Sequence, residues 1–126
     1  MKLALISGLL LLSIIVAGAF TDASVSKLCV NTKNDMEALI SKAMEENFED
    51  SATLLDKNIK IWQDKRVFLS VLQHHDFYDN LYSALLRAKQ YAVFRNGALL
   101  AGEAASIVGM LYDIQSFDSF SIENIF

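Results

Sequence analysis

Residues 3–20, LALISGLLLLSIIVAGAF, form the longest uncharged stretch of the chain. Only Ser7, Gly8, Ser13 and Gly18 interrupt its run of large apolar residues and alanines. A helix of this length rises about 27 Å at about 1.5 Å per residue, close to the roughly 30 Å of a bilayer hydrocarbon core. The stretch therefore predicts a helix that meets a membrane, and the mixed-charge sequence after it predicts a water-soluble part.

Two interpretations of residues 1–20 remain open, a removable signal peptide and an uncleaved membrane anchor. Lys2 is a short positive region, and Ala17-Gly18-Ala19 fits a small-x-small cleavage site. The apolar run, however, is longer than the roughly 7 to 15 residues usual in a signal peptide, which favours an anchor.

Both interpretations place the body of the protein, residues 21–126, outside the cytoplasm. A positive charge at Lys2 favours retention of the amino end on the cytoplasmic side. We therefore expect a single-pass cell-membrane protein whose C-terminal domain is extracytoplasmic, with a secreted protein as the alternative.

The composition of the body is typical of one helical domain. Proline is absent, the chain has 5 glycines among 126 residues, and nothing in it predicts disorder. The net charge is −4, and the 11 basic residues are scattered, whereas nucleic-acid binding requires a clustered positive surface. We expect no nucleic-acid partner. The aromatic residues recur at helical spacing, which is more typical of a core than of a pocket, so no small-molecule ligand or cofactor is predicted.

Cys29 is the single cysteine, so no disulfide can form within the chain. It lies between Leu28 and Val30, and a cysteine in such a setting is more often a small buried hydrophobic residue than an intermolecular disulfide partner. The stability of the domain must therefore come from packing.

Apolar residues at three- and four-residue spacing predict four helices in the body. The expected helices run from a capping box at Asn34 and Glu37 to Asn47, from a cap at Asp50 to Leu72, from a cap at Asp76 to a left-handed end at Asn96-Gly97, and from Leu100 to Ile114.

Short connections between these helices favour antiparallel neighbours. We therefore predict an all-α fold after the N-terminal hydrophobic helix, either an antiparallel four-helix bundle or stacked α-hairpins like those of tetratricopeptide repeats. A weak internal repeat, with Asn47-Phe48 matching Asn96-Gly97, fits a pair of hairpins.

The sequence also resembles a family of small bacterial proteins. The resemblance rests on Asn47–Ala52, Trp62, His75-Asp76, Leu85 with Tyr91, and the terminal Ser121–Phe126, in that order and at that spacing. The family is domain of unknown function 4363, small membrane-anchored helical proteins of Firmicutes. The resemblance implies an uncleaved anchor and an extracytoplasmic helical domain, and no established activity. The chain departs from the family in having Phe48 where a tryptophan is common, and in its glycines at 97, 102 and 109.

The one concentrated group of ionisable residues is His74, His75 and Asp76. A metal site or hydrolase centre there would need a further carboxylate, such as Asp118 or Glu123, to fold back onto the histidines. Adjacent histidines on an extended turn point apart, so we favour a helix cap instead. Because the sequence contains no recognised catalytic or phosphate-binding motif, we expect no enzyme, no catalytic residue and no metal.

Two groups of residues are candidate interaction surfaces. Gly102, Ser106 and Gly109 belong to a strip of small side chains on the last predicted helix, and each glycine there costs up to about 1 kcal/mol relative to alanine. Phe120 and Phe126 belong to a terminal stretch with five large apolar residues. We therefore expect a membrane contact through residues 3–20 and a possible protein partner.

Overall fold

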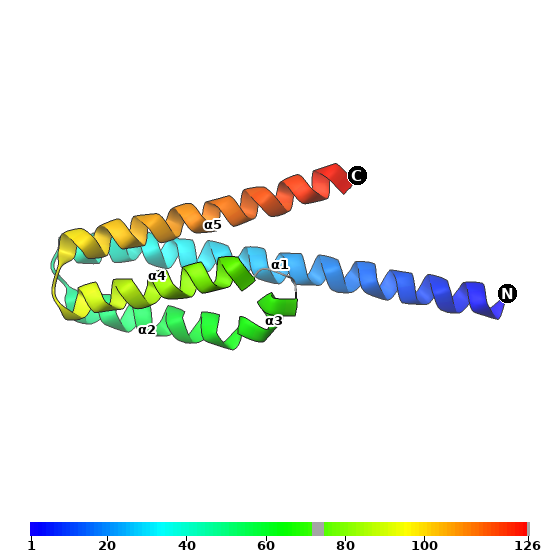
Figure 1. Ribbon diagram of the computed structural model, residues 1–126, viewed down its shortest axis with the longest axis horizontal. Coiled ribbons are helices and arrows are strands. Elements are labelled where there is room, and N and C mark those ends of the chain that lie inside the picture. Colours follow the sequence, from blue (N-terminus) through cyan, green and yellow to red (C-terminus); the bar gives the residue numbers. More distant parts are fainter. Residues whose placement is uncertain (72–74, 126) are drawn as a thin grey trace.

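The structure is a computed structural model that describes the backbone of residues 1–71 and 75–125 (Figure 1). Side chains are described except at 17–24, 68, 70–75 and 115–126. The chain forms α1 (Lys2–Met44), α2 (Phe48–Asp64), α3 (Arg66–Val71), α4 (His75–Val93) and α5 (Gly97–Ile125).

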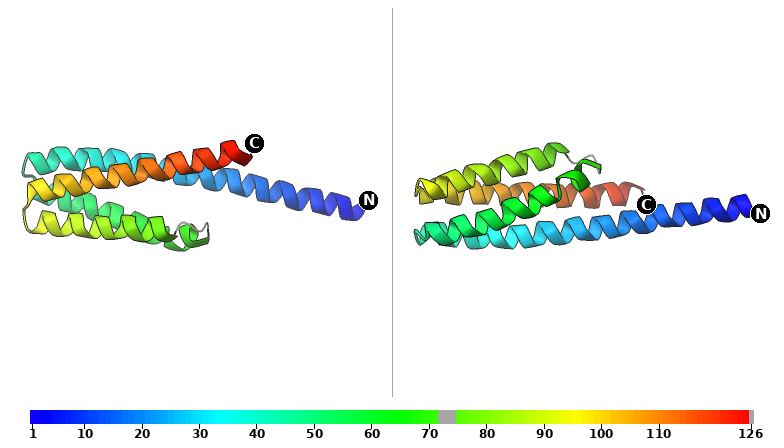
Figure 2. Two further views of the ribbon diagram at one scale, coloured as in Figure 1. Left: turned by 45° about the horizontal axis from the view of Figure 1, so that its top comes forward. Right: turned by 90° about the horizontal axis from the view of Figure 1, so that it is seen from below.

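The four long helices pack in a ring. α1 lies against α5 and α2, and α4 lies against α2 and α5, while the short α3 packs against the start of α4. Successive long helices run in opposite directions, so both hairpin turns lie at one end of the molecule and α1 extends far beyond the other end (Figures 1 and 2). The predicted all-α fold is confirmed, and the closed ring is the arrangement of a bundle.

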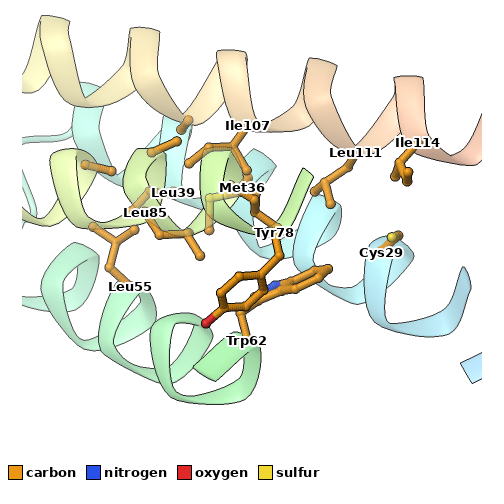
Figure 3. Close-up of a cluster of buried hydrophobic side chains, with 14 of the residues drawn as sticks. Cys29, Met36, Leu39, Leu55, Trp62, Tyr78, Leu85, Ile107, Leu111 and Ile114 are labelled. Carbon is orange, nitrogen blue, oxygen red and sulfur yellow. The ribbon is translucent and has the colours of Figure 1, made fainter. Parts of the chain in front are cut away.

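A continuous apolar core fills the space between the four long helices. Figure 3 shows Leu39 and Met36 of α1 facing Leu85 of α4 and Ile107 of α5. Trp62 is fully buried, and its ring meets Phe77 edge-on with centroids 6.1 Å apart. The described residues of the stripes predicted from helical spacing point inward, including those on the last helix, except Met44 at the end of α1, which is 77% exposed. The inward stripe of the last helix consists of Leu100, Ala104, Ile107, Leu111 and Ile114.

The first helix differs most from the prediction. Asn34 lies in the middle of α1, which runs without a break from Lys2 to Met44, so the capping box at Asn34 and Glu37 does not start a helix. A capping sequence is a local preference, and the buried residues before it, from Val25 to Thr32, keep this part of the chain helical against α5 and α2. The apolar segment and the first body helix are one element.

Both hairpin turns have the same structure, which explains the internal repeat. In the first, Asn47 N–H donates to the Lys42 carbonyl at 2.9 Å and Glu46 is left-handed with φ 59°. In the second, Asn96 N–H donates to the Tyr91 carbonyl at 2.9 Å and Arg95 has φ 57°. Each turn is a Schellman motif followed by an asparagine N-cap.

The structure corrects three predicted helix boundaries, two of them at the hairpin turns. Asn47, not Asp50, caps α2, because its side-chain oxygen accepts from Asp50 N–H at 3.3 Å. Gly97 is the first residue of α5 rather than a left-handed end, and Asn96 caps that helix through Leu99 N–H at 3.1 Å. The helix predicted from Asp50 to Leu72 is interrupted at Lys65, where the bend into α3 brings Leu69 into the core.

Polar contacts fix the position of α2 along α1. The Trp62 indole N–H donates to Thr32 Oγ1 at 2.9 Å in the buried interior. Further along, Asn58 Nδ2 donates to Asp35 Oδ2 at 3.1 Å, and Lys57 Nζ reaches the same oxygen at 3.3 Å. Because a shift of either helix by one turn would break these contacts, they select one alignment of the two helices.

Replacing Thr32 by valine tests the buried hydrogen bond. Valine has nearly the same shape but no hydroxyl, so Thr32→Val leaves the buried Trp62 N–H without this acceptor. We expect a loss of about 1–3 kcal/mol in the free energy of unfolding, measured by chemical denaturation. Thr32→Ser keeps the hydroxyl and serves as the control; equal losses in both variants would show that the hydrogen bond contributes nothing.

Two glycines of α5 give a matched pair of variants. A Cβ at Gly97 would lie 2.8 Å from the Ala43 backbone oxygen, whereas a Cβ at Gly102 meets nothing within 4 Å. We expect Gly97→Ala to lower the melting temperature, because the two helix ends must separate. Gly102→Ala should raise stability by up to about 1 kcal/mol through helix propensity. A stabilising Gly97→Ala would contradict the close approach of α1 and α5.

Candidate functional site

The first part of α1 is an exposed apolar arm, defined here as residues 3–16. Its ten large apolar side chains are 57–82% exposed, including Leu3 at 82% and Leu12 at 57%. By contrast, α1 buries Val25, Cys29 and Met36 once it enters the bundle. Ser13 within the arm satisfies its hydroxyl by donating to the Leu9 carbonyl at 3.1 Å. The arm thus presents apolar surface whose backbone groups are already bonded within the helix.

A second surface is the outer face of α5, defined as Ala98, Leu99, Gly102, Ala105, Ser106, Gly109 and Tyr112, all of which are exposed. The face includes the predicted candidates Gly102, Ser106 and Gly109. A Cβ at Gly102 or Gly109 would meet nothing within 4 Å, so neither glycine serves close packing between the helices of this chain.

The residues of the outer face of α5 are themselves uncharged, and the Lys33 ammonium of α1 lies 4.5 Å from the Tyr112 ring centre at one end of the face. Glu103 is the one charged residue between Gly97 and Tyr112, and it accepts two hydrogen bonds from the Arg87 guanidinium, at 3.1 and 3.0 Å. Its side chain is 16% exposed. An uncharged, small-residue surface of this kind allows another helix to approach closely.

Among the described residues, one helix is long and apolar enough to cross a membrane, and it is Gly97–Ile114 of α5. The apolar stretch described at the start of α1, Lys2–Val16, is shorter. In α5, the stripe from Leu100 to Ile114 is buried and packs into the bundle, whereas Leu99 and Tyr112 are 50% and 57% exposed. Because 28% of this window is buried, the core accounts for part of its hydropathy, and the uncharged exposed side of α5 supplies the rest.

The histidine turn lies mostly outside the described residues. His74 is not described, and the side chains of His75, Asp118 and Glu123 are not described either. Asp76 is exposed in the first turn of α4. The part of the chain that the structure describes contains no group of three His, Cys, Asp or Glu residues able to hold a metal ion. A site at His74, His75 and Asp76 is thus neither assembled nor contradicted here.

The terminal candidates are likewise only partly described. Phe120 lies on the helical backbone of α5, but its side chain is outside the described residues, as is the whole of Phe126. The backbone nevertheless shows that most of the terminal apolar stretch continues α5. The helical spacing, which ends the last predicted helix at Ile114, gives no signal for this extension.

A groove between α4 and α5, with a volume of about 570 Å³, was not predicted from the sequence. Its walls include Phe77 and Arg87 of α4 and Met110, Asp113 and Ile114 of α5. The Arg87 guanidinium already binds Glu103, so it is not a vacant anion site. No sequence motif marks the groove, because residues about 30 positions apart meet only once α4 and α5 are paired.

The nearby tyrosines do not add a reactive group to this groove. Burial raises the pKa of Tyr78, and the neighbouring Tyr82 raises it further, so the phenol of Tyr78 stays neutral near pH 7. The two rings stack with centroids 5.7 Å apart, and the Tyr82 hydroxyl accepts from Gln63 Nε2 at 3.0 Å. The hydrogen bond between Tyr82 and Gln63 links α4 to α2.

These features define a class of protein, an antiparallel helical bundle whose first helix continues outward as an exposed apolar arm. The family described as domain of unknown function (DUF4363) matches residues 19–125, and the chain belongs to that family. The family resemblance seen in the sequence is therefore confirmed. No match was found among curated proteins or among solved structures.

A zinc titration tests whether the histidine turn binds metal. We expect the detergent-solubilised full chain to bind zinc no more tightly than a His74→Ala/His75→Ala variant, because two adjacent histidine ligands alone make a poor site. Isothermal titration calorimetry is the measurement. Tighter binding by the unsubstituted chain would support the metal interpretation.

Proposed function

We propose that the protein is a membrane-anchored, extracytoplasmic helical module that binds another protein and has no catalytic role. One observation carries the proposal: the exposed apolar arm and the core-forming part of α1 are one unbroken helix. The arm is inserted in lipid, and the bundle is held directly above it.

The energetics of the arm favour lipid over water. Burying a large aliphatic side chain that was exposed gains about 1.5–3 kcal/mol, and the arm has ten such side chains. The helix from Leu3 to Phe20 is also close to the thickness of the hydrocarbon core. Lys2 stays on the cytoplasmic side, so the bundle is outside.

Protein binding is assigned to the outer face of α5. One side of α5 packs into the bundle, whereas Gly102, Ser106 and Gly109 are exposed on the other side. No other part of the described chain packs against the two glycines. Several charged residues elsewhere on the bundle form surface ion pairs, such as Lys89 with Asp56. The uncharged face of α5 is the surface that best suits a packed partner.

Charges placed in the arm test the membrane anchor. Leu10→Lys/Leu11→Lys adds roughly 6 kcal/mol to the cost of insertion at the helix centre. We expect the unsubstituted chain to remain in the membrane pellet after carbonate extraction and the variant to lose this association. Met44→Lys/Phe94→Lys changes two residues at the opposite end that are 77% and 75% exposed, and it should leave the pellet fraction unchanged.

The mass of the unsubstituted protein separates an anchor from a secreted product. An intact amino end in the membrane pellet supports the anchor. A product in the medium that lacks residues 1–19 would replace it with the secreted alternative, and such a cut would leave the bundle from Val25 onward in place. Full-length protein free in the cytosol would contradict both.

A further inference from the structure

The direction of α5 brings its far end back toward the membrane. α1 and α5 are antiparallel neighbours, and the carboxyl end of α5 lies on the same side of the bundle as the amino end of α1 (Figures 1 and 2). At the hairpin end, Gly97 abuts the Ala43 carbonyl. Farther along, the Lys33 ammonium lies 4.5 Å from the centre of the Tyr112 ring, and Figure 3 shows Cys29 of α1 and Ile114 of α5 at the same end of the core.

The level that α5 reaches follows from the helix rise. Ile125 is 11 residues beyond Ile114, which is about 16 Å along the axis at about 1.5 Å per residue. A distance of 11 residues from Cys29 toward the amino end of α1 leads to Gly18, which lies within the last turn of the apolar run that ends at Phe20. The backbone of α5 therefore extends to the level at which α1 enters the lipid.

α4 does not extend as far. Phe77 of α4 and Ile114 of α5 line the same groove, and α4 begins at His75, two residues before Phe77. α5 thus continues for about two and a half turns past the start of α4, and Figure 1 shows α1 and α5 projecting beyond the other helices. Residues 115–126, QSFDSFSIENIF, comprise this part of α5 and the terminal Phe126. They include five large apolar residues and no basic residue.

We propose that residues 117–125 of α5 dip into the outer surface of the membrane that holds α1, giving the bundle a second lipid contact. The inference rests on the proposed anchor. Phenylalanine and isoleucine gain free energy in the interfacial region of a bilayer. Because the stretch has two acidic residues and no basic one, the contact is apolar and does not require anionic lipid.

Spin labels on the full chain test this contact. The chain carries Cys29→Ala and one new cysteine, at Phe117, Phe120 or Ile125, and is reconstituted in phosphatidylcholine vesicles. Oxygen concentrates in lipid and a nickel chelate in water, so the ratio of the two collision rates reports depth. We expect the ratio to rise from 117 to 125 and to exceed several-fold the ratio at Leu99→Cys, which is at the hairpin end and 50% exposed.

A label at Leu11→Cys separates the two proposals. A lipid-exposed label at 11 together with water-exposed labels at 117, 120 and 125 would overturn the second contact and leave the anchor standing. A water-exposed label at 11 would overturn the anchor itself. Labels at 117–125 that reach neither oxygen nor nickel would show that this stretch is covered by protein, which also overturns the lipid contact.

Discussion

The unbroken helix α1 is the constraint on which the rest of the structure depends. Lys2 and Met44 belong to one helix, so the apolar arm and the core residues Cys29, Met36 and Leu39 share one axis. A helix transmits position and direction, unlike a flexible linker. Every other helix is therefore placed relative to the arm as well as to the core, and any orientation of the arm in a membrane fixes the orientation of the bundle.

The contacts between α1 and its two neighbours differ in kind. Against α2, α1 uses polar groups, with Thr32 bonded to Trp62 and Asp35 bonded to Asn58. Against α5, it uses the apolar stripe and the close approach at Gly97. Directional hydrogen bonds select one alignment of α1 and α2, whereas apolar burial supplies most of the stabilisation between α1 and α5.

The sequence was sufficient for the fold class and the buried faces, because helical spacing directly records which side of each helix is covered. Leu55, Trp62 and Leu69 are buried as the spacing predicts. The ends of the helices were harder to predict from the sequence. Asn34 and Asn47 carry the same capping preference, yet only Asn47 caps a helix, because packing on both sides of Asn34 keeps α1 continuous. The groove between α4 and α5 depends on pairing that no local pattern encodes.

The glycines of α5 show why the candidate interaction surface could not be identified from the sequence alone. Gly97 and Gly102 are the same residue on the same helix, but only Gly97 is required by a neighbour, the Ala43 carbonyl. The helix-propensity cost of Gly102 and Gly109 has no compensation within this chain. If the arm anchors the bundle, a partner in the same membrane is held at high effective concentration and in a fixed orientation. Under that condition a shallow face of small residues is enough for specific binding, even where its affinity in free solution would be weak.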